Sequence, residues 1–177
     1  MPRNWDEHFA QAAGLDFTPS PLVVEVAEKL RPGRALDLAC GAGRNSLHLA
    51  ALGWHVTAVD ASPNALRILR QRAAGLPIET QLADLEAGHF TIEPSGYDLI
   101  CDILYLQRSL FPEIREGVRL GGVVAAEVLL ADGGPHRFAL EPGELRAEFA
   151  GWKILYYSES APPSQTRATA RIIARNA

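Results

Sequence analysis

The stretch LDLACGAGR, residues 36–44, decides the fold of this chain. The apolar residues of a short strand run straight into a turn with glycines at positions 41 and 43, and a helix is expected to begin near Asn45. Glycine adopts backbone angles that a Cβ atom forbids, and it lets a ligand approach the main chain closely. The free N–H groups and the positive dipole end of the helix would point at that ligand. The stretch therefore predicts a binding site at the end of a strand.

A second strand that ends in an acid completes this pattern. The apolar segment 54–59 is followed directly by Asp60. In doubly wound folds an acid in this place accepts hydrogen bonds from the hydroxyls of a ribose. Strand, glycine turn, helix and acid-ended strand occur in the required order, which is far more specific than a glycine pair alone. We therefore expect a pocket for a cofactor that carries a nucleoside.

Two classes of cofactor could use such a pocket. The dinucleotide fingerprint G-x-G-x-x-G has a third glycine that allows close packing of helix and strand, and Ser46 stands at that position. Arg44 and Asn45 follow the turn, whereas a pyrophosphate usually lies against bare helix backbone. The residues thus disfavour an NAD(P)-dependent oxidoreductase, which is kept as an alternative.

The segment 37–45, DLACGAGRN, resembles motif I of the class I S-adenosylmethionine (SAM) methyltransferases. It differs from the usual D-x-G-x-G-x-G at Ala39, a small residue that is expected to need little extra room. Segments 56–62 and 82–85 resemble the second and third motifs, and 97–102 and 120–124 resemble the fourth and fifth strands. Within the superfamily, residues 5–9, 40–46 and 138–145 are similar to small methyltransferases of the tellurite-resistance type.

This resemblance implies a SAM site. Asp60 would hold the ribose, Asp84 with Leu85 the adenine, and Asp37 would orient the methionine part through its charged amino group. Trp5, His8 and Phe9 would fold over the cofactor as a lid. The residues expected to border the cofactor are Asp37, Ala39, Cys40, Gly41, Gly43, Arg44, Asn45, Asp60, Ala61, Asp84, Leu85, Asp102 and Ile103. A non-catalytic SAM-binding protein is a further alternative.

Apolar periodicity and turn residues predict alternating strands and helices, and hence a mostly parallel sheet covered on both faces. The last two strands leave no room for a helix between them and must pair antiparallel. The family pattern is a single doubly wound, Rossmann-like α/β domain with seven strands in the order 3-2-1-4-5-7-6 and strand 7 antiparallel. We expect an N-terminal arm over residues 1–21 and the methyltransferase domain over 22–177. The predicted strands are 34–39, 54–59, 78–82, 97–103, 122–130, 152–158 and 166–175, and the predicted helices are 21–30, 45–52, 63–74, 111–119 and 142–149.

Methyl transfer from a positively charged sulfur is an in-line displacement, in which positioning alone can remove much of the barrier. No catalytic residue is therefore assigned. The polar residues on the acceptor side are Tyr105, Arg108, Glu127 and His136, with Arg137 next to it. Each has a structural interpretation as well: Tyr105 as a packing aromatic, Arg108 as half of an ion pair and Glu127 as a satisfied buried acid.

Composition and charge limit the kinds of partner that the chain is expected to bind. At 177 residues and 47% hydrophobic content, the chain suits one globular domain. A formal net charge of −4 offers no basic field for nucleic acid. Two cysteines do not form a disulfide framework, no histidine pair has metal-ligand spacing, and neither a signal peptide nor a membrane span is recognised. We expect a cytoplasmic monomer or homodimer without a metal, acting on a small molecule such as a thiol, an oxygen or nitrogen compound, or a tellurite-type oxyanion.

Overall fold

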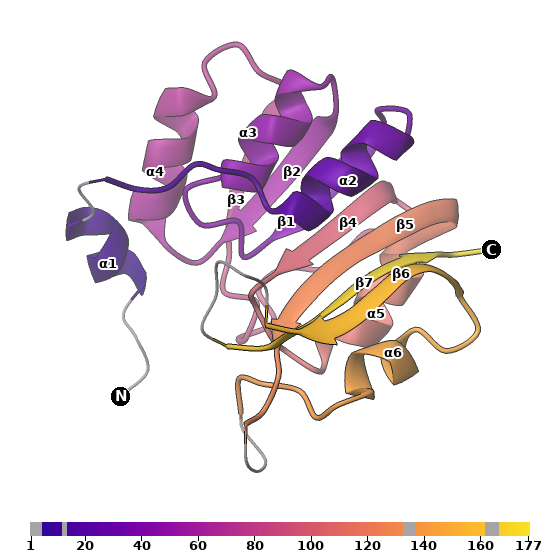
Figure 1. The fold of residues 1–177 in the computed structure, drawn as a ribbon. Helices are drawn as coiled ribbons and strands as arrows, with labels where there is room; N and C mark the ends of the chain where they lie inside the picture. Colours follow the sequence, from indigo (N-terminus) through magenta and orange to yellow (C-terminus); the bar gives the residue numbers. More distant parts are fainter. Residues whose placement is uncertain (1–4, 12–13, 133–136, 162–166) are drawn as a thin grey trace. The chain divides into compact units, whose positions relative to one another are not determined.

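The structure is a computed structural model that describes residues 5–11, 14–132, 137–161 and 167–177 (Figure 1). The chain divides into two compact units, Met1–Thr91 and Ile92–Ala177. Each unit is built around its own run of neighbouring strands.

The first unit holds three parallel strands in the order β3-β2-β1. They are β1 (Arg34–Leu38), β2 (His55–Asp60) and β3 (Ile78–Leu82). Residues 35–38 of β1 are all buried, as expected for a parallel strand covered on both faces. Because the three strands are parallel and in register, their carboxyl ends lie at one edge. The helices of this unit are α1 (Trp5–Gln11), α2 (Pro21–Lys29), α3 (Arg44–Ala51) and α4 (Pro63–Arg72).

Local sequence explains where α4 begins. Ser62 is its N-cap, and the Ser62 hydroxyl accepts a hydrogen bond from the amide of Ala65 at 3.0 Å. Pro63 occupies the first helical position, where its fixed φ suits the helix and its missing N–H costs nothing. The buried face consists of Ala65, Leu66 and Leu69, as the spacing predicts.

The second unit holds four strands in the order β4-β5-β7-β6. They are β4 (Tyr97–Ile103), β5 (Val118–Leu129), β6 (Lys153–Ser160) and β7 (Thr169–Arg175). β4 and β5 are parallel, whereas β7 is antiparallel to both β5 and β6. Among its described residues, the helices are α5 (Leu110–Gly117) and α6 (Glu144–Glu148). The rings of Phe111 on α5 and Phe149 at the end of α6 meet edge to face at 6.1 Å, so both helices cover the same face.

These two runs are the two halves of the predicted order 3-2-1-4-5-7-6, and the predicted antiparallel strand 7 is present, so the predicted fold class is confirmed. Some bounds differ. β5 begins at Val118, four residues before the predicted start, because Val118 pairs with Tyr97 across a register shift. α6 begins at Glu144 instead of Pro142, because Gly143 has a left-handed φ of 84°. The expected division at residue 21 into an arm and a domain stays a prediction.

A first prediction concerns the packing of Gly43. A Cβ atom at this residue, whose φ is +85°, would lie 2.3 Å from Cδ1 of the buried Leu69. Gly43→Ala should lower the free energy of unfolding by about 2–4 kcal/mol, the sum of backbone strain and overpacking. The matched control is Gly75→Ala, with a φ of +82° and no atom within 4 Å; it should lose only the strain of about 1–2 kcal/mol. Urea denaturation measures both, and equal losses would show that the contact with Leu69 does not matter.

Candidate functional site

The turn after β1 has a left-handed backbone at three of its residues. The φ angles are +49° at Ala39, +56° at Gly41 and +85° at Gly43. The amide of Gly43 closes the turn on the carbonyl of Cys40 at 3.0 Å. For an L-residue such as Ala39 this conformation costs roughly 1–2 kcal/mol. The expectation that alanine fits cheaply here is therefore only half right: the methyl group is small, but the backbone is one that favours glycine.

A buried carboxylate lies under this turn. Asp37 and Ser46 are 1% and 0% exposed, and the Ser46 hydroxyl donates to Oδ2 of Asp37 at 2.5 Å. Burial raises the pKa of Asp37 to about 6, although Ser46 and the positive charge of Arg44 both act to lower that pKa. Sequence reasoning treated Ser46 only as a missing third glycine. The structure shows it as the partner of Asp37.

Asp60 connects the end of β2 to the glycine turn. Its Oδ2 accepts from the amide of Gly41 and its Oδ1 from the amide of Ser62, both at 2.8 Å. Burial raises the pKa of Asp60 despite these hydrogen bonds, and the negative charge of Asp6 adds to the rise. Each carboxylate oxygen has a second lone pair. Asp60 therefore orders the turn and keeps acceptor capacity for a ligand.

The side chains on either side of the turn have structural partners. The amide oxygen of the buried Asn45 accepts from the backbone N–H of Ser20 at 2.9 Å, which ties α3 to the start of α2. Arg44 is half-buried at the start of α3. Hydrogen bonds from Thr18 lower the pKa of Asp16, and the positive charge of Arg44 adds to this lowering. Burial, followed by the charges of Asp37 and Asp60, raises the pKa of the Cys40 thiol well above its usual value. Cys40 is therefore held as a neutral thiol and not as a nucleophile.

The turn after β3 lies beside the end of β2. The amide of Ala83 donates to the carbonyl of Asp60 at 3.1 Å. Asp84 is exposed, and its Oδ1 accepts from the amide of Ala87 at 3.2 Å, whereas Leu85 is buried. Ala61 is exposed next to Asp60. The structure thus places the predicted ribose and adenine residues at adjacent strand ends.

α1 is attached to the same region. Oδ1 of Asp6 accepts from the Ser62 hydroxyl at 2.7 Å and from the amide of Asn64 at 3.0 Å, and Oδ2 accepts from the Asn64 side chain at 3.0 Å. Sequence reasoning missed Asp6, although the acid is part of the quoted segment 5–9. The Phe9 ring lies over Gly41, where a Cβ atom would be 3.1 Å from Cζ. The rings of Trp5 and His8 meet edge to face at 5.6 Å.

In the second unit, the acceptor-side candidates have protein partners. The Tyr105 hydroxyl donates to Oε1 of Gln107 at 2.7 Å. Arg108 forms a bidentate ion pair with Glu144, at 2.5 and 3.0 Å, and also donates to the carbonyl of Ala139 at 3.0 Å. The structural interpretation of Arg108 therefore accounts for its position.

Two predicted cofactor residues and one acceptor-side candidate lie near the carboxyl ends of β4 and β5. Asp102 and Ile103 are buried at the end of β4. Glu127 on β5 is buried and lies 3.3 Å from Nε of Arg171. Arg137 is exposed, with its guanidinium 5.1 Å from the Phe138 ring centre. His136 lies outside the described residues.

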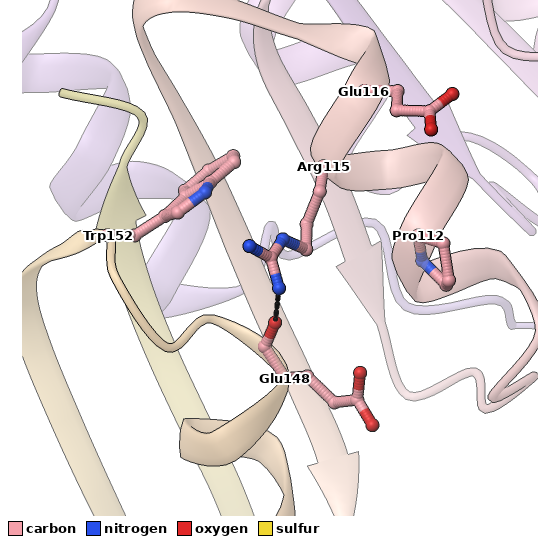
Figure 2. A pocket seen from close by; sticks show the side chains of 5 residues that line it. All are labelled: Pro112, Arg115, Glu116, Glu148 and Trp152. Atoms are coloured by element: carbon pink, nitrogen blue, oxygen red, sulfur yellow. Dashed lines mark hydrogen bonds between the residues drawn. The ribbon is translucent and has the colours of Figure 1, made fainter.

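A hollow of about 440 Å³ lies elsewhere in this unit (Figure 2). Its lining residues are Pro112, Arg115, Glu116, Glu148 and Trp152. The Arg115 guanidinium donates to the backbone carbonyl of Glu148 at 2.9 Å. Arg115 and Glu116 lie in the last turn of α5, which ends at Gly117 directly before β5 begins at Val118. The hollow is therefore at the amino end of β5, whereas ligands of such sheets bind at the carboxyl ends.

Within the residues that the structure describes, no group of three or more His, Cys, Asp or Glu side chains could hold a metal ion. Over the same part of the chain, none of the helices combines the length and the apolar character needed to cross a membrane.

Comparisons with known proteins identify the family of the chain. The family model "Tellurite resistance protein TehB" matches residues 6–169. The chain is 32% identical over 152 residues to the probable SAM-dependent methyltransferase TehB of Haemophilus influenzae, covering 78% of this chain and 52% of that protein. It is 31% identical over 119 residues to the probable thiol methyltransferase 2 of Arabidopsis thaliana, covering 66% of this chain and 50% of that protein. The chain spans about half the length of these curated relatives. The crystal structure of TehB from Haemophilus influenzae matches with a TM-score of 0.75 at 26% identity, covering 98% of this chain and 67% of that one.

A second prediction follows from the buried Asp37. Its pKa is raised from 3.8 to about 6, so between these values the folded protein holds a proton that the unfolded chain has lost. The stability contribution is therefore full below pH 4 and lost as the pH rises through 6, by about 3 kcal/mol in all. Asp37→Asn keeps an acceptor for the Ser46 hydroxyl and has no such proton. Relative to wild type, its free energy of unfolding should rise by this amount between pH 4 and pH 7 in urea titrations, and a difference independent of pH would contradict the prediction.

Proposed function

Because the chain belongs to the TehB family of tellurite resistance proteins, we propose that it is a SAM-dependent methyltransferase that acts on a small molecule. The observation that carries the proposal is the left-handed turn after β1, which the carboxylate of Asp60 joins to the end of β2. Family membership supports SAM as the cofactor, since the relative from Haemophilus influenzae is named a SAM-dependent methyltransferase.

The proposed roles follow from these positions. Asp60 would accept from the ribose hydroxyls with its remaining lone pairs, and Asp84 and Leu85 would hold the adenine by a hydrogen bond and an apolar contact. The turn from Ala39 to Gly43 would border the methionine part. Asp37 would favour the ammonium group of that part through its negative charge, which acts over a short distance in a buried place.

Charge supports SAM over a dinucleotide. Three carboxylates, Asp6, Asp37 and Asp60, lie in one hydrogen-bonded region around the turn. Two of these charges make the ionisation of a neighbour less favourable: the charge of Asp60 acts to raise the pKa of Asp37, and that of Asp6 acts to raise the pKa of Asp60. Such a field favours a ligand with a sulfonium and an ammonium group and opposes a diphosphate. The NAD(P)-dependent alternative has no comparable support.

When bound, SAM supplies a methyl group already activated by a positive sulfur. The task of the protein is to hold the acceptor in line with that group, which needs no nucleophilic side chain. The buried thiol of Cys40 is neutral, as expected for a site that needs no nucleophilic side chain. A general base is needed only for an acceptor that arrives protonated.

A small acceptor is supported by the names of the relatives, one of which is a probable thiol methyltransferase. We include thiols, oxygen and nitrogen compounds and tellurite-type oxyanions in the proposed class. A net charge of −4 supports a protein that does not bind nucleic acid. Two buried free cysteines support the cytoplasm as its location. We also propose that the protein is a monomer or a homodimer and is not attached to a membrane.

Calorimetry with SAM, S-adenosylhomocysteine and NAD tests the cofactor. We expect saturable binding of the first two and none of NAD; binding of NAD without SAM would favour the oxidoreductase. Turnover with thiols, phenols, amines, tellurite and selenite then tests catalysis. Cofactor binding without product from any of these acceptors would favour the non-catalytic alternative.

A third prediction concerns the ribose. Asp60→Ala should weaken SAM binding by about 1–3 kcal/mol, because ribose donors then lack their acceptor. The control Asp132→Ala removes an exposed carboxylate of the second unit and should bind SAM like wild type. Circular dichroism checks the fold of both variants, since Asp60 also orders the turn. An unchanged affinity in a folded Asp60→Ala protein would mean that the ribose lies elsewhere.

A fourth prediction concerns the lid, formed by α1 with Trp5, His8 and Phe9. If α1 covers the bound cofactor, Phe9→Ala should weaken SAM binding by about 1 kcal/mol through lost apolar contact. Leu120→Ala, at a side chain 78% exposed in the second unit, is the control for a general loss of apolar surface. Tighter binding in Phe9→Ala would instead show that the ring over Gly41 competes with the ligand.

A further inference from the structure

A cluster of three hydrogen-bonded side chains in the second unit plays no part in the roles described above. Glu127 on β5 and Arg171 on β7 are register partners, and Thr169 lies two residues before Arg171. The Thr169 hydroxyl donates to Oε1 of Glu127 at 3.2 Å, and Nε of Arg171 lies 3.1 Å from that hydroxyl and 3.3 Å from Oε1. Glu127 is 4% exposed, and a buried carboxylate is tolerated only when it is paired. The cluster therefore fixes the stem of the arginine.

The cluster lies on the face of the sheet opposite to α6. Oε1 of Glu159 on β6 accepts from the amide that precedes α6 at 2.6 Å, so Glu159 points toward that helix. Side chains alternate between faces along a strand, so Ser158 points the other way. Ser158 is the register partner of Arg171. Its hydroxyl is 2.9 Å from that of Tyr156, two residues earlier on the same face. Two hydroxyl groups therefore lie on the same face as the guanidinium.

Arg171 uses only one edge of its guanidinium. Both of its contacts are made by Nε, and its terminal nitrogens Nη1 and Nη2 have no partner among the residues that the structure describes. The side chain is 17% exposed, and neither nitrogen is among the buried atoms without partners. Arg108 in the same unit differs, because its Nε and Nη2 contact both carboxylate oxygens of Glu144 and a carbonyl. Arg171 is thus held in place with two donors directed away from the cluster.

Two parallel N–H donors on a fixed guanidinium match the two oxygens of a carboxylate or an oxyanion. Glu127 lies two residues before the end of β5, and ligands of open α/β sheets bind outside the carboxyl ends of the strands. We infer that Arg171, assisted by the Ser158 hydroxyl, binds the acidic group of a small ligand, and that Glu127 and Thr169 are positioning residues for it. This inference goes beyond the proposed function: it assigns to the second unit a binding site for a carboxylate or an oxyanion such as tellurite.

The test measures binding of three probes by calorimetry, with and without saturating S-adenosylhomocysteine. Tellurite represents an oxyanion, thioglycolate an acceptor with a carboxylate, and 2-mercaptoethanol a neutral thiol of similar size. Arg171→Lys keeps the charge but not the paired donors. The double variant Glu127→Gln with Arg171→Gln removes both charges and leaves no unpaired acid. Arg167→Gln, at an exposed arginine four residues earlier, is the matched control for the general positive field.

We expect one or both anions to bind wild type and the control equally, and to bind both Arg171 variants at least about tenfold more weakly. The binding of 2-mercaptoethanol should not change. The ¹⁵N resonance of Arg171 Nε should shift on titration with the anion that binds. A shift with tellurite would indicate an oxyanion ligand, and a shift with thioglycolate would indicate a carboxylate ligand.

The inference is overturned if neither anion binds wild type, if the Arg171 variants retain wild-type affinity, or if Arg167→Gln loses as much. Failure of the proposed function has a different signature. In that case S-adenosylhomocysteine does not bind, while the titrations without it still report whether Arg171 holds an anion.

Discussion

The carboxylate of Asp60 determines the geometry of the first unit. One oxygen holds the amide of Gly41 and the other that of Ser62, so a single side chain orders both the turn after β1 and the entry to α4. The turn needs this support, because it includes Ala39 in a left-handed backbone that is unfavourable for an L-residue. The hydroxyl that caps α4 is in turn held by Asp6. A chain of hydrogen bonds thus runs from α1 through α4 and β2 to the turn.

The charges in this region favour one kind of ligand. Asp37 is buried, Asp60 is half-buried, and burial raises the pKa of both. A cationic ligand would stabilise their ionised forms, whereas without one the protein keeps an unfavourable concentration of negative charge. Functional sites often contain such unfavourable charges, because binding of the ligand offsets the electrostatic free energy that they cost. The same argument explains why a phosphate-binding interpretation of the glycine turn fits poorly.

The sequence predicts the strands, the helices from α2 to α6 and the glycine turn well, because these depend on local patterns, whereas α1 is not predicted. Ser62 and Pro63 mark the start of α4, and the acid that ends β2 is visible as a break in an apolar run. What sequence could not predict are contacts between distant residues. Ser46 donates to Asp37 nine positions away, and Asp6 reaches Ser62 across 56 positions. Neither pair has a spacing that indicates contact. The start of α6 was predicted two residues early, because the left-handed conformation of Gly143 is a property of the folded backbone.

Two arginines of the second unit show what a structure adds to a list of polar residues. Arg108 follows β4 and is a candidate from the sequence, yet its Nε and Nη2 already donate to Glu144 and to a backbone carbonyl. Arg171 lies within an apolar final strand and is not a candidate from the sequence, yet its side chain is fixed through Nε and its two terminal nitrogens are unused by the described residues. Residue type and position in the sequence do not distinguish these two arginines. The difference lies in which edge of the planar group is already hydrogen-bonded, and that edge determines whether an arginine stabilises the fold or is available for a ligand.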